Sequence, residues 1–440
     1  MLRLHDTAYG TVRELTLRDP GRVSIYVCGP TVYDVPHIGH GRAALTYDIL
    51  RRYLEWTGLA VDHVSNITDI DDKIIQRANE RGRSSTEVAA EFEQAWWDAV
   101  DALGILRPTH DPHATAFVDR MLELIADLMA QDKAYETDDG VYFVSESVPD
   151  YGLLARQSLD SLRSGARVEV EEQKRSPLDF VLWKKSKPGE PSWESPWGPG
   201  RPGWHTECVV MSLDLLGDGF DLHSGGLDLM FPHHENERAQ AVAMGHAFAR
   251  HWMHHAFVEV GGEKMSKSLH NFTSLTDLLS RHDARAYRLL VLRSHYRSPM
   301  EVTPETIADA ESGLDRLDSF ARRFKPGAEA DHAALDRFRE LMDDDLRTPQ
   351  AIALLFDLVG QANAADDAAA AAAAYEIAGA MGLELRGAAD EIDAGTQALM
   401  AERDAARAAR DFARADAIRD ALQSQGWVVE DTSEGTRVHR

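Results

Sequence analysis

Two histidines, His37 and His40, stand three residues apart where an apolar run ends and a helical pattern begins. The run from Val23 to Val27 is typical of a buried strand, and Gly29 and Pro30 close it. A strand, a tight loop and a helix N-terminus together form a seat for phosphate, because the first helical turn offers unpaired N–H groups and a positive dipole end. Imidazoles at this place would add hydrogen bonds to a phosphate.

The chain contains two cysteines, Cys28 and Cys208, in 440 residues. Two cysteines supply no disulfide framework, and the first residues do not have the pattern of a signal peptide. The simplest interpretation is that both thiols are small buried apolar groups. However, Cys28 ends the predicted strand, where side chains of a parallel sheet face a ligand crevice, and Cys208 closes the segment GWHTEC (203–208).

A histidine and a carboxylate downstream of Cys208 complete a possible metal site. The segment FPHHENE (231–237) begins with a proline that suits the first turn of a helix, so His233 and Glu237 would share one helix face. One nitrogen and one carboxylate on that face, with the thiolates of Cys28 and Cys208, make a tetrahedral Zn²⁺ set. Only the residue spacing supports this ligand set, since no C-x-x-C pair is present.

Two lysines, Lys264 and Lys267, lie in the segment GGEKMSKSL (261–269), after a predicted strand from Phe257 to Val260. In most proteins such a segment is a solvated loop. The alternative is that the two ammonium groups are movable charges for the β- and γ-phosphates of ATP.

Two further segments follow predicted strands. In NITDIDDK (66–73), Thr68 would project into the same crevice as Cys28, whereas the three aspartates are typical of helix caps. In HSGGLD (223–228), Gly226 and Asp228 would suit the close approach of a ribose, whose hydroxyls would donate to the carboxylate.

These segments, in this order, resemble the motifs of class I aminoacyl-tRNA synthetases and, within that class, the cysteinyl-tRNA synthetase family. PHIGH (36–40) and KMSKS (264–268) resemble the two signature motifs of the class. The narrower resemblance rests on CGPTVYD (28–34), NITDIDDK (66–73), GWHTEC (203–208), HSGGLDLMFPHHENE (223–237), SHYRSP (294–299), ARDFARADAIRDAL (409–422) and VEDTSEGT (429–436).

The resemblance implies ATP-dependent ligation of L-cysteine to tRNA(Cys) through a cysteinyl-adenylate intermediate. It assigns catalysis to His37, His40, Lys264 and Lys267. It assigns ATP binding to His37, His40, Gly226, Asp228 and Lys267. It assigns substrate binding to Gly29, Thr31, Thr68 and Trp204, and the metal to Cys28, Cys208, His233 and Glu237. It also implies one Zn²⁺ per chain and Mg²⁺ with ATP. We further expect a cytoplasmic location and a monomer.

Zinc would explain how cysteine is distinguished from serine. Serine is nearly isosteric but supplies no soft anionic sulfur at neutral pH, so coordination would discriminate by more than the roughly 1–3 kcal/mol of a methyl-sized difference. We therefore expect no editing domain. Trp204 would wall the cysteine pocket or, alternatively, pack beneath the zinc-binding segment.

The predicted fold is α/β: a Rossmann-like parallel-sheet catalytic domain with a connective insertion, followed by a helical bundle and a small mixed α/β C-terminal module. The predicted boundaries are 1–295 for the catalytic domain, with the insertion at about 108–200 and the zinc helix and lysine segment at about 203–275, then 296–390 for the bundle and 391–440 for an anticodon-binding module. The insertion should contain one helix, 115–131, and a short strand near 141–144. One long helix is expected over 396–423, and the seven alanines 368–374 also predict a helix.

The formal net charge is −26, from 73 acidic and 47 basic residues, which by itself argues against nucleic-acid binding. A local basic track is nevertheless compatible with an acidic remainder. The candidates for it are Arg51, Arg52, Lys174, Arg175, Lys184, Lys185, Lys187 and the arginines of 403–419. The last group alternates with acids, so an exposed helix with ion pairs explains it equally well. No apolar run approaches the length of a membrane span.

Two alternatives stay open at this point. The cysteine ligases of mycothiol synthesis resemble the same family but act on an amino sugar, and the tail over 410–436 argues against them. A relative that binds tRNA or a protein without chemistry would not need His37, His40 and the two lysines. The chain departs from the family pattern at His270, where glycine is expected, and at Val438 and His439, where an aromatic residue is common.

Overall fold

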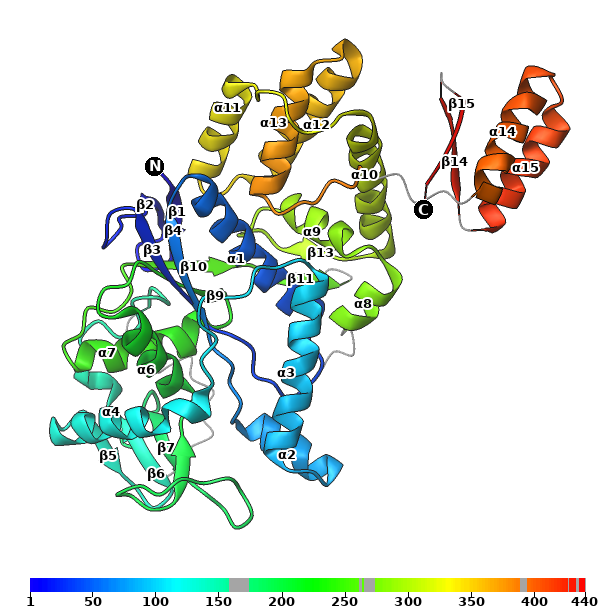
Figure 1. Cartoon of the computed structure of the whole chain (residues 1–440). Coiled ribbons are helices and arrows are strands. Elements are labelled where there is room, and N and C mark those ends of the chain that lie inside the picture. The colour runs from blue at the N-terminus through cyan, green and yellow to red at the C-terminus, as the bar shows by residue number, and fades with distance from the viewer. Residues whose placement is uncertain are drawn as a thin grey trace. The chain divides into compact units, whose positions relative to one another are not determined.

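The computed structural model describes residues 1–157, 174–260, 263–264, 274–387, 394–425, 427–432 and 435–439 (Figure 1). These residues belong to two compact units. The first comprises Met1–Leu314 and Ala328–Glu384, and the second comprises Asp315–Gly327 and Leu385–Arg440.

A four-stranded parallel sheet lies at the centre of the first unit. Its order is β10–β9–β3–β4, formed by β3 (Arg22–Val27), β4 (Ala60–Ser65), β9 (Leu222–Gly226) and β10 (His251–His255). β3 is buried from Val23 to Val27, as expected for an inner strand of a parallel sheet with both faces covered. The predicted Rossmann-like parallel sheet is therefore confirmed.

The strand order places a crevice at the carboxyl end of β3. The chain continues from β3 through helix α1 (Ile38–Trp56) to β4 on one side, while β9 and β10 pair on the other side. Ligands of open α/β sheets bind where the strand order reverses in this way. The β3–β9 pairing therefore brings segments from both halves of the sequence to one place.

The two helices after β4 begin at capping residues, of which the sequence indicated the first. Asp71 is the N-cap of α2 (Asp72–Arg81), because its side chain accepts from the backbone N–H of Lys73. Helix α3 (Ser85–Ala102) begins with a reciprocal capping box between Ser84 and Glu87. A short antiparallel pair, β1 (Arg3–Asp6) and β2 (Thr11–Glu14), precedes the parallel sheet.

The insertion folds as helix α4 (Val118–Ala130) with an antiparallel sheet of order β5–β6–β7–β8. Its strands are β5 (Ala134–Glu136), β6 (Gly140–Phe143), β7 (Phe180–Lys185) and β8 (Gly200–Pro202). The sequence identified only the helix and β6. The other strands were missed because β5 and β8 are three residues long and β7 pairs with β6 across about forty residues. Residues 158–173, which include most of the charged stretch before Lys174, lie outside the described residues.

The second half of the first unit carries α6 (Trp204–Leu216), the helical turn η3 (Met230–His234) and α7 (Glu235–Ala243). A three-stranded sheet of order β12–β11–β13 follows, from β11 (Val258–Val260), β12 (Glu263–Lys264) and β13 (Met300–Glu301), with α8 (Leu275–Arg281) and α9 (Ala284–Leu292). The strand expected over 257–260 is thus β11 and lies in a second sheet, because the chain leaves the parallel sheet after His255.

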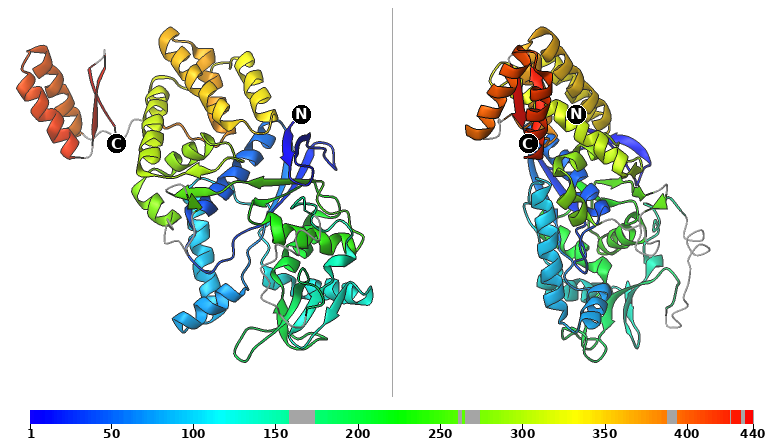
Figure 2. Two further views of the ribbon diagram at one scale, coloured as in Figure 1. Left: turned by 180° about the vertical axis from the view of Figure 1, so that it is seen from behind. Right: turned by 90° about the vertical axis from the view of Figure 1, so that its right-hand side faces the viewer.

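The helices at the end of the first unit are α11 (His332–Asp343), α12 (Thr348–Ala365) and α13 (Ala368–Ala380), and α10 (Pro304–Arg323) runs from the first unit into the second. The alanine run forms α13, which Asp367 caps. The buried Arg288 of α9 donates to Asp48 of α1 and to the carbonyl of Met381, so it connects the parallel-sheet region to the end of α13. Figure 2 shows α11, α12 and α13, in yellow and orange, side by side.

In the second unit, α14 (Ala394–Ala408) and α15 (Phe412–Ser424) replace the one long helix that was expected over 396–423. The backbone of Arg410 has a positive φ of 60°, which ends the first helix, and Asp411 caps the second. β14 (Val428–Thr432) and β15 (Gly435–His439) form the expected strand pair. Val438, one of the departures from the family pattern, packs in an apolar core with Leu422 and Trp427.

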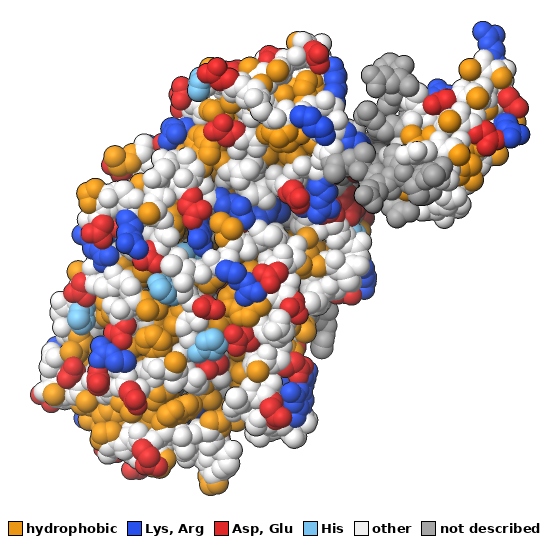
Figure 3. Space-filling view, in the orientation of Figure 1, with side chains coloured by type: hydrophobic (Ala, Val, Ile, Leu, Met, Phe, Trp, Pro, Cys, Tyr) orange, Lys and Arg blue, Asp and Glu red, His pale blue; other side chains and the backbone are white. Residues whose placement is uncertain are grey.

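Among the described helices, none combines the length and apolar character that a membrane crossing requires. Acidic, basic and apolar side chains are interspersed over the face shown in Figure 3.

Candidate functional site

A cavity of about 370 Å³ opens at the carboxyl ends of β3 and β9. Many of the predicted site residues line it: Cys28, Gly29, Thr31, His37, His40, Trp204, Gly226 and Asp228. Cys208, His233, Glu237 and Thr68 are buried next to these residues and do not line the cavity. The structure thus gathers side chains from both halves of the sheet.

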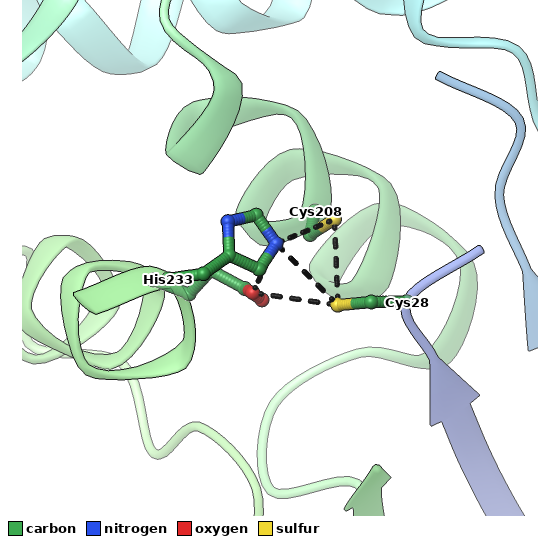
Figure 4. Close-up of side chains that lie close together, drawn as sticks. Cys28, Cys208 and His233 are labelled. Carbon is green, nitrogen blue, oxygen red and sulfur yellow. Dashed lines mark hydrogen bonds and ion pairs between the residues drawn. The ribbon is translucent and has the colours of Figure 1, made fainter. Parts of the chain in front are cut away.

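The two cysteines and the two predicted partners of Cys208 converge at one point (Figure 4). Cys28 Sγ lies 3.7 Å from Cys208 Sγ and 3.6 Å from His233 Nε2, and Cys208 Sγ lies 3.7 Å from His233 Nε2. Glu237 Oε1 lies 3.4 Å from Cys28 Sγ and 3.0 Å from His233 Nε2. Both cysteines are free thiols.

These separations fit the edges of a tetrahedron around a zinc ion. Zinc–sulfur bonds of about 2.3 Å and zinc–nitrogen or zinc–oxygen bonds of about 2.0–2.1 Å, at tetrahedral angles, place the donor atoms roughly 3.3–3.8 Å apart. Of the five separations given above, four lie in this range, and the 3.0 Å between His233 Nε2 and Glu237 Oε1 lies just below it. Two sulfurs, one imidazole and one carboxylate are also donors that zinc prefers.

A second group of donors, Cys28, His223, His234 and Glu237, also lies close enough together to hold a metal. We favour the first group, because His223 Nε2 lies 2.7 Å from Glu237 Oε2. That distance is a direct hydrogen bond, and it is shorter than each of the separations given for the first group. His223 therefore orients the carboxylate of Glu237 through this hydrogen bond, which is a usual arrangement around metal sites.

Aromatic and imidazole rings fix the orientation of His233. Its Nδ1 lies 2.8 Å from Nδ1 of His205, and its ring stacks on Trp204 with centroids 4.1 Å apart. Trp204 is 37% exposed and lines the cavity, so it both packs on His233 and walls the cavity. The sequence offered these two roles as alternatives, and the structure combines them.

The charges of the four donors are strongly coupled. Burial, together with Cys208 and Glu237, raises the pKa of the Cys28 thiol well above its ordinary value. Burial also opposes ionisation of Cys208, but hydrogen bonds with Cys28 and His233 lower its pKa to about 6. His233 behaves conversely: burial opposes its protonation, yet Glu237 and Cys208 raise its pKa to about 10.

The carboxyl group of Glu237 stays ionised although it is buried, because His223 and His233 hold its pKa well below the ordinary value. Within the protein itself, protons on neighbouring groups therefore balance the negative charges of a thiolate and a carboxylate. A divalent cation would replace those protons, which is the usual coupling between metal binding and proton release.

His37 and His40 lie at the start of α1. His37 is the N-cap, and the two residues form a reciprocal capping box in which each side chain accepts from the backbone N–H of the other. Their rings stack with centroids 3.7 Å apart and an interplanar angle of 15°. Both line the cavity at a helix N-terminus, where a phosphate is favoured.

Gly29 and Gly226 permit close approaches that a side chain would block. A Cβ on Gly29 would lie 1.6 Å from the carbonyl oxygen of Asn66, and one on Gly226 would lie 2.4 Å from Asp228 Oδ1. The backbone N–H of Gly29 donates to Asn66 Oδ1 at 2.9 Å. Each glycine thus brings a strand end against a polar neighbour at the cavity.

Thr68 is buried and its hydroxyl is engaged within the protein. It donates to Glu207 Oε2 at 3.0 Å and accepts from Asn66 Nδ2 at 3.2 Å. Thr68 does not line the cavity, and its direct contact with substrate stays a prediction. Burial and the neighbouring Cys208 raise the pKa of Glu207 well above its ordinary value.

The lysine segment is described only at its ends. Lys264 lies in β12, and Lys267 and His270 lie outside the described residues. After the gap, Ser274 forms a backbone bridge with His37, and the amide of Leu275 donates to the carbonyl of Pro36 at 2.9 Å. The chain therefore returns from the lysine segment directly to the start of α1.

Several contributing residues were not found from the sequence. They are Asn66, His205, Glu207 and His223, whose partners lie far away in the chain or on other elements. The motifs NITDIDDK, GWHTEC and HSGGLD contained these residues, but only the folded chain shows which donor each one contacts.

Most residues of the suggested basic track form ion pairs. Arg51 pairs with Glu55, Arg52 with Asp48, Lys184 with Asp72 and Lys185 with Glu136. In the second unit, Arg403 and Arg407 pair with Asp431, and Arg414 pairs with Glu402. The interpretation of the C-terminal arginines as a helix with ion pairs describes these contacts well.

Family models match almost the whole chain. The model described as "tRNA synthetases class I (C) catalytic domain" matches residues 14–312, the DALR domain matches 337–386, and the "Cysteinyl-tRNA ligase anticodon binding domain" matches 389–439.

Curated relatives match at full length. The chain is 48% identical over 459 residues to a cysteine–tRNA ligase of Halorhodospira halophila and 47% identical over 462 residues to one of Alkalilimnicola ehrlichii, with 100% of both chains covered in each case.

Among solved structures, the fold is similar to that of methionyl-tRNA synthetase of Mycobacterium tuberculosis in complex with methionyl-adenylate. The TM-score is 0.60 at 17% identity, covering 82% of this chain and 89% of that one. A leucyl synthetase in a ternary complex from Agrobacterium radiobacter K84 gives a TM-score of 0.61 at 11% identity, covering 84% of each chain. At these identities the similarity concerns the fold alone.

Proposed function

The chain belongs to the cysteine–tRNA ligases, a family of class I aminoacyl-tRNA synthetases, and we propose that it joins L-cysteine to tRNA(Cys) through a cysteinyl-adenylate intermediate. The observation that carries this proposal is the set of four donor atoms at tetrahedral separations beside a cavity with a phosphate-binding helix N-terminus. That combination suits a small thiol substrate activated by ATP.

In the first step, a carboxylate oxygen of cysteine attacks the α-phosphorus of ATP, and the bond to the bridging oxygen breaks to release pyrophosphate. The start of α1 supports the triphosphate, because its N–H groups and the rings of His37 and His40 line the same cavity. Gly226 and Asp228 would hold the ribose. The protein acts by positioning and by stabilising charge, with no covalent enzyme intermediate.

Lys264 and Lys267 would neutralise the departing pyrophosphate, and Mg²⁺ would accompany ATP, held mainly by phosphate oxygens and water. Support for a role of this segment comes from its described end, where Ser274 pairs with the backbone of His37.

Cys28, Cys208, His233 and Glu237 would hold one Zn²⁺, which when bound offers a Lewis-acid position for the substrate thiolate. Trp204, stacked on His233, would limit the space next to that position. Gly29 and Thr31 line the cavity on the side of Cys28 and would contact the amino acid. Thr68 would act through Glu207 and Asn66.

In the second step, a hydroxyl of the terminal tRNA ribose attacks the acyl carbon, the acyl–phosphate bond breaks, and AMP leaves. The match of the anticodon-binding family model to residues 389–439 supports tRNA as the acceptor and does not favour an amino sugar. The cytoplasmic location and the monomeric state stay predictions.

The test is to incubate the purified protein with ATP, labelled cysteine and total tRNA. We expect ribonuclease-sensitive label on RNA, cysteine-dependent pyrophosphate exchange, and loss of both after removal of zinc. Exchange without label on tRNA would contradict the acceptor, and exchange that survives complete removal of zinc would contradict the role of the metal.

A further inference from the structure

Lys73 and Tyr33 form a cation–aromatic pair at the cavity that the first reaction step does not use. The Lys73 ammonium lies over the Tyr33 ring, 5.3 Å from its centroid, and both residues line the cavity. Tyr33 follows β3, whereas Lys73 lies in the first turn of α2. They are therefore on different elements from the proposed nucleotide contacts on α1 and β9.

Lys73 brings a positive charge to the lining of the cavity. Among the described residues that line the cavity, Lys73 is the single lysine or arginine. Its side chain is exposed, and no described carboxylate forms an ion pair with it, although the chain carries a net charge of −26. By contrast, Lys184 and Lys185 both pair with acidic side chains.

Neighbouring contacts hold Tyr33 and Lys73 in place. Arg77, one helical turn after Lys73 on α2, forms an ion pair with Asp34, the residue after Tyr33, at 2.6 Å. Tyr33 also packs against an apolar cluster that includes Ile67 and Ile74. The Arg77–Asp34 ion pair and the apolar contacts of Tyr33 thus hold one face of α2 against the segment after β3, so the fold fixes the position of Lys73.

A third substrate must reach this cavity for the second step. The amino acid would occupy the side of Cys28 and Trp204, and the adenylate would occupy the side of His37, His40 and Asp228. The end of an RNA strand brings an anionic phosphate and a flat base, which a lysine and an aromatic ring recognise. Tyr33 and Lys73 offer these two groups together.

We propose that Tyr33 and Lys73 bind the 3′-terminal nucleotide of tRNA during transfer. The Lys73 ammonium leaves the Tyr33 ring for a backbone phosphate, and the ring then becomes a stacking surface for the terminal base. The exchange is favourable because a cation gains less from the face of an exposed ring than from a charge-assisted contact with a phosphate. This proposal rests on the proposed function and concerns its second step alone.

The experiment measures the two steps separately in the full-length protein. In Lys73→Gln, we expect cysteine-dependent pyrophosphate exchange within twofold of the parent and a kcat/KM for tRNA lowered by about tenfold or more. Lys73→Arg should restore most of the transfer, because it keeps the charge. Lys133→Gln, a lysine that does not line the cavity, is the matched control and should change neither step.

Salt dependence distinguishes a phosphate contact from a structural effect. Loss of one contact to single-stranded RNA should reduce the slope of log(kcat/KM) for tRNA against log[salt] by about 0.7. For the ring, Tyr33→Phe should behave as the parent, whereas Tyr33→Leu should lower transfer by about tenfold through lost stacking.

Three results would overturn the proposal: equal losses of exchange and transfer in Lys73→Gln, full transfer in that variant, or an unchanged salt slope. Absence of exchange in the parent protein would instead refute the proposed function, so the two failures are distinguishable.

Discussion

His37 and His40 accept hydrogen bonds through the same ring atom: Nδ1 of each accepts from the backbone N–H of the other. In a neutral imidazole, a nitrogen that accepts carries no hydrogen, so Nε2 is the N–H donor on both rings. The helix cap thereby fixes the tautomer that a phosphate oxygen requires.

This relationship separates the structural from the chemical role of His37. In His37→Asn, the side-chain oxygen can still cap α1 but the Nε2 donor is lost, so we expect unchanged thermal stability and a first step slowed by about 10²–10³-fold. His37→Gln should lose the cap, at about 1 kcal/mol of stability, and keep more of the activity. Pyrophosphate exchange and urea unfolding measure the two effects; equal rates in both variants would contradict the assignment.

The metal site should contain about one zinc ion per chain, and Cys208→Ser should lose most of it. Because a hydroxyl is a poor zinc ligand, we expect this variant to show a large rise in KM for cysteine with little change in KM for ATP. Metal content by elemental analysis gives a readout that is independent of activity. A full complement of zinc in the variant would exclude Cys208 as a ligand.

Arg42 connects α1 to the strand that leads toward the lysine segment. Its guanidinium is buried and donates to the carbonyl oxygens of Phe257, His295, Tyr296 and Ser298, with the first contact at 2.6 Å. In Arg42→Met, these four carbonyls lose their buried donor, so we expect the free energy of unfolding to fall by about 2–4 kcal/mol.

Because Phe257 and Val258 line the cavity, KM for ATP should also rise in Arg42→Met. The control is Arg22→Met, an arginine whose side chain is 61% exposed, for which we expect a change within about 0.5 kcal/mol. A loss of stability equal to that of the control would show that the four carbonyls do not depend on Arg42.

His63 should make stability depend on pH. Burial, with a smaller effect from Arg51, lowers its pKa from 6.5 to about 4, and neither ring nitrogen has a hydrogen-bond partner among the described residues. The unfolded chain therefore binds more protons than the folded one between these pH values. The contribution of neutral His63 to the free energy of unfolding is complete above about pH 6.5. It is lost as the pH falls toward 4, by about 3 kcal/mol in all.

In His63→Leu, the difference in unfolding free energy between pH 7 and pH 4.5 should be smaller than in the parent, and urea titrations at both values measure it. Other buried histidines still contribute to the slope in both proteins, so the comparison isolates His63. His332→Gln, at an exposed position, should leave the difference unchanged. An identical pH dependence in His63→Leu and the parent would contradict the lowered pKa.

The sequence by itself determined the features that depend on neighbours within one turn or one strand. The i, i+4 spacing of His233 and Glu237, the apolar run before Cys28, the cap at Asp71 and the alanine helix were all visible locally, since local hydrogen bonds and periodicity create them. The ordered set of motifs also identified the family.

Only the tertiary structure decided which distant groups meet. The pairing of β3 with β9 brings Cys28 to Cys208, and the same packing makes His223 the partner of Glu237 and engages the Thr68 hydroxyl with Glu207. The extra strands of the insertion likewise exist through hydrogen bonds to residues far along the chain. Such contacts form when burial and sheet pairing compensate the entropy of closing long loops, and no local pattern records that balance.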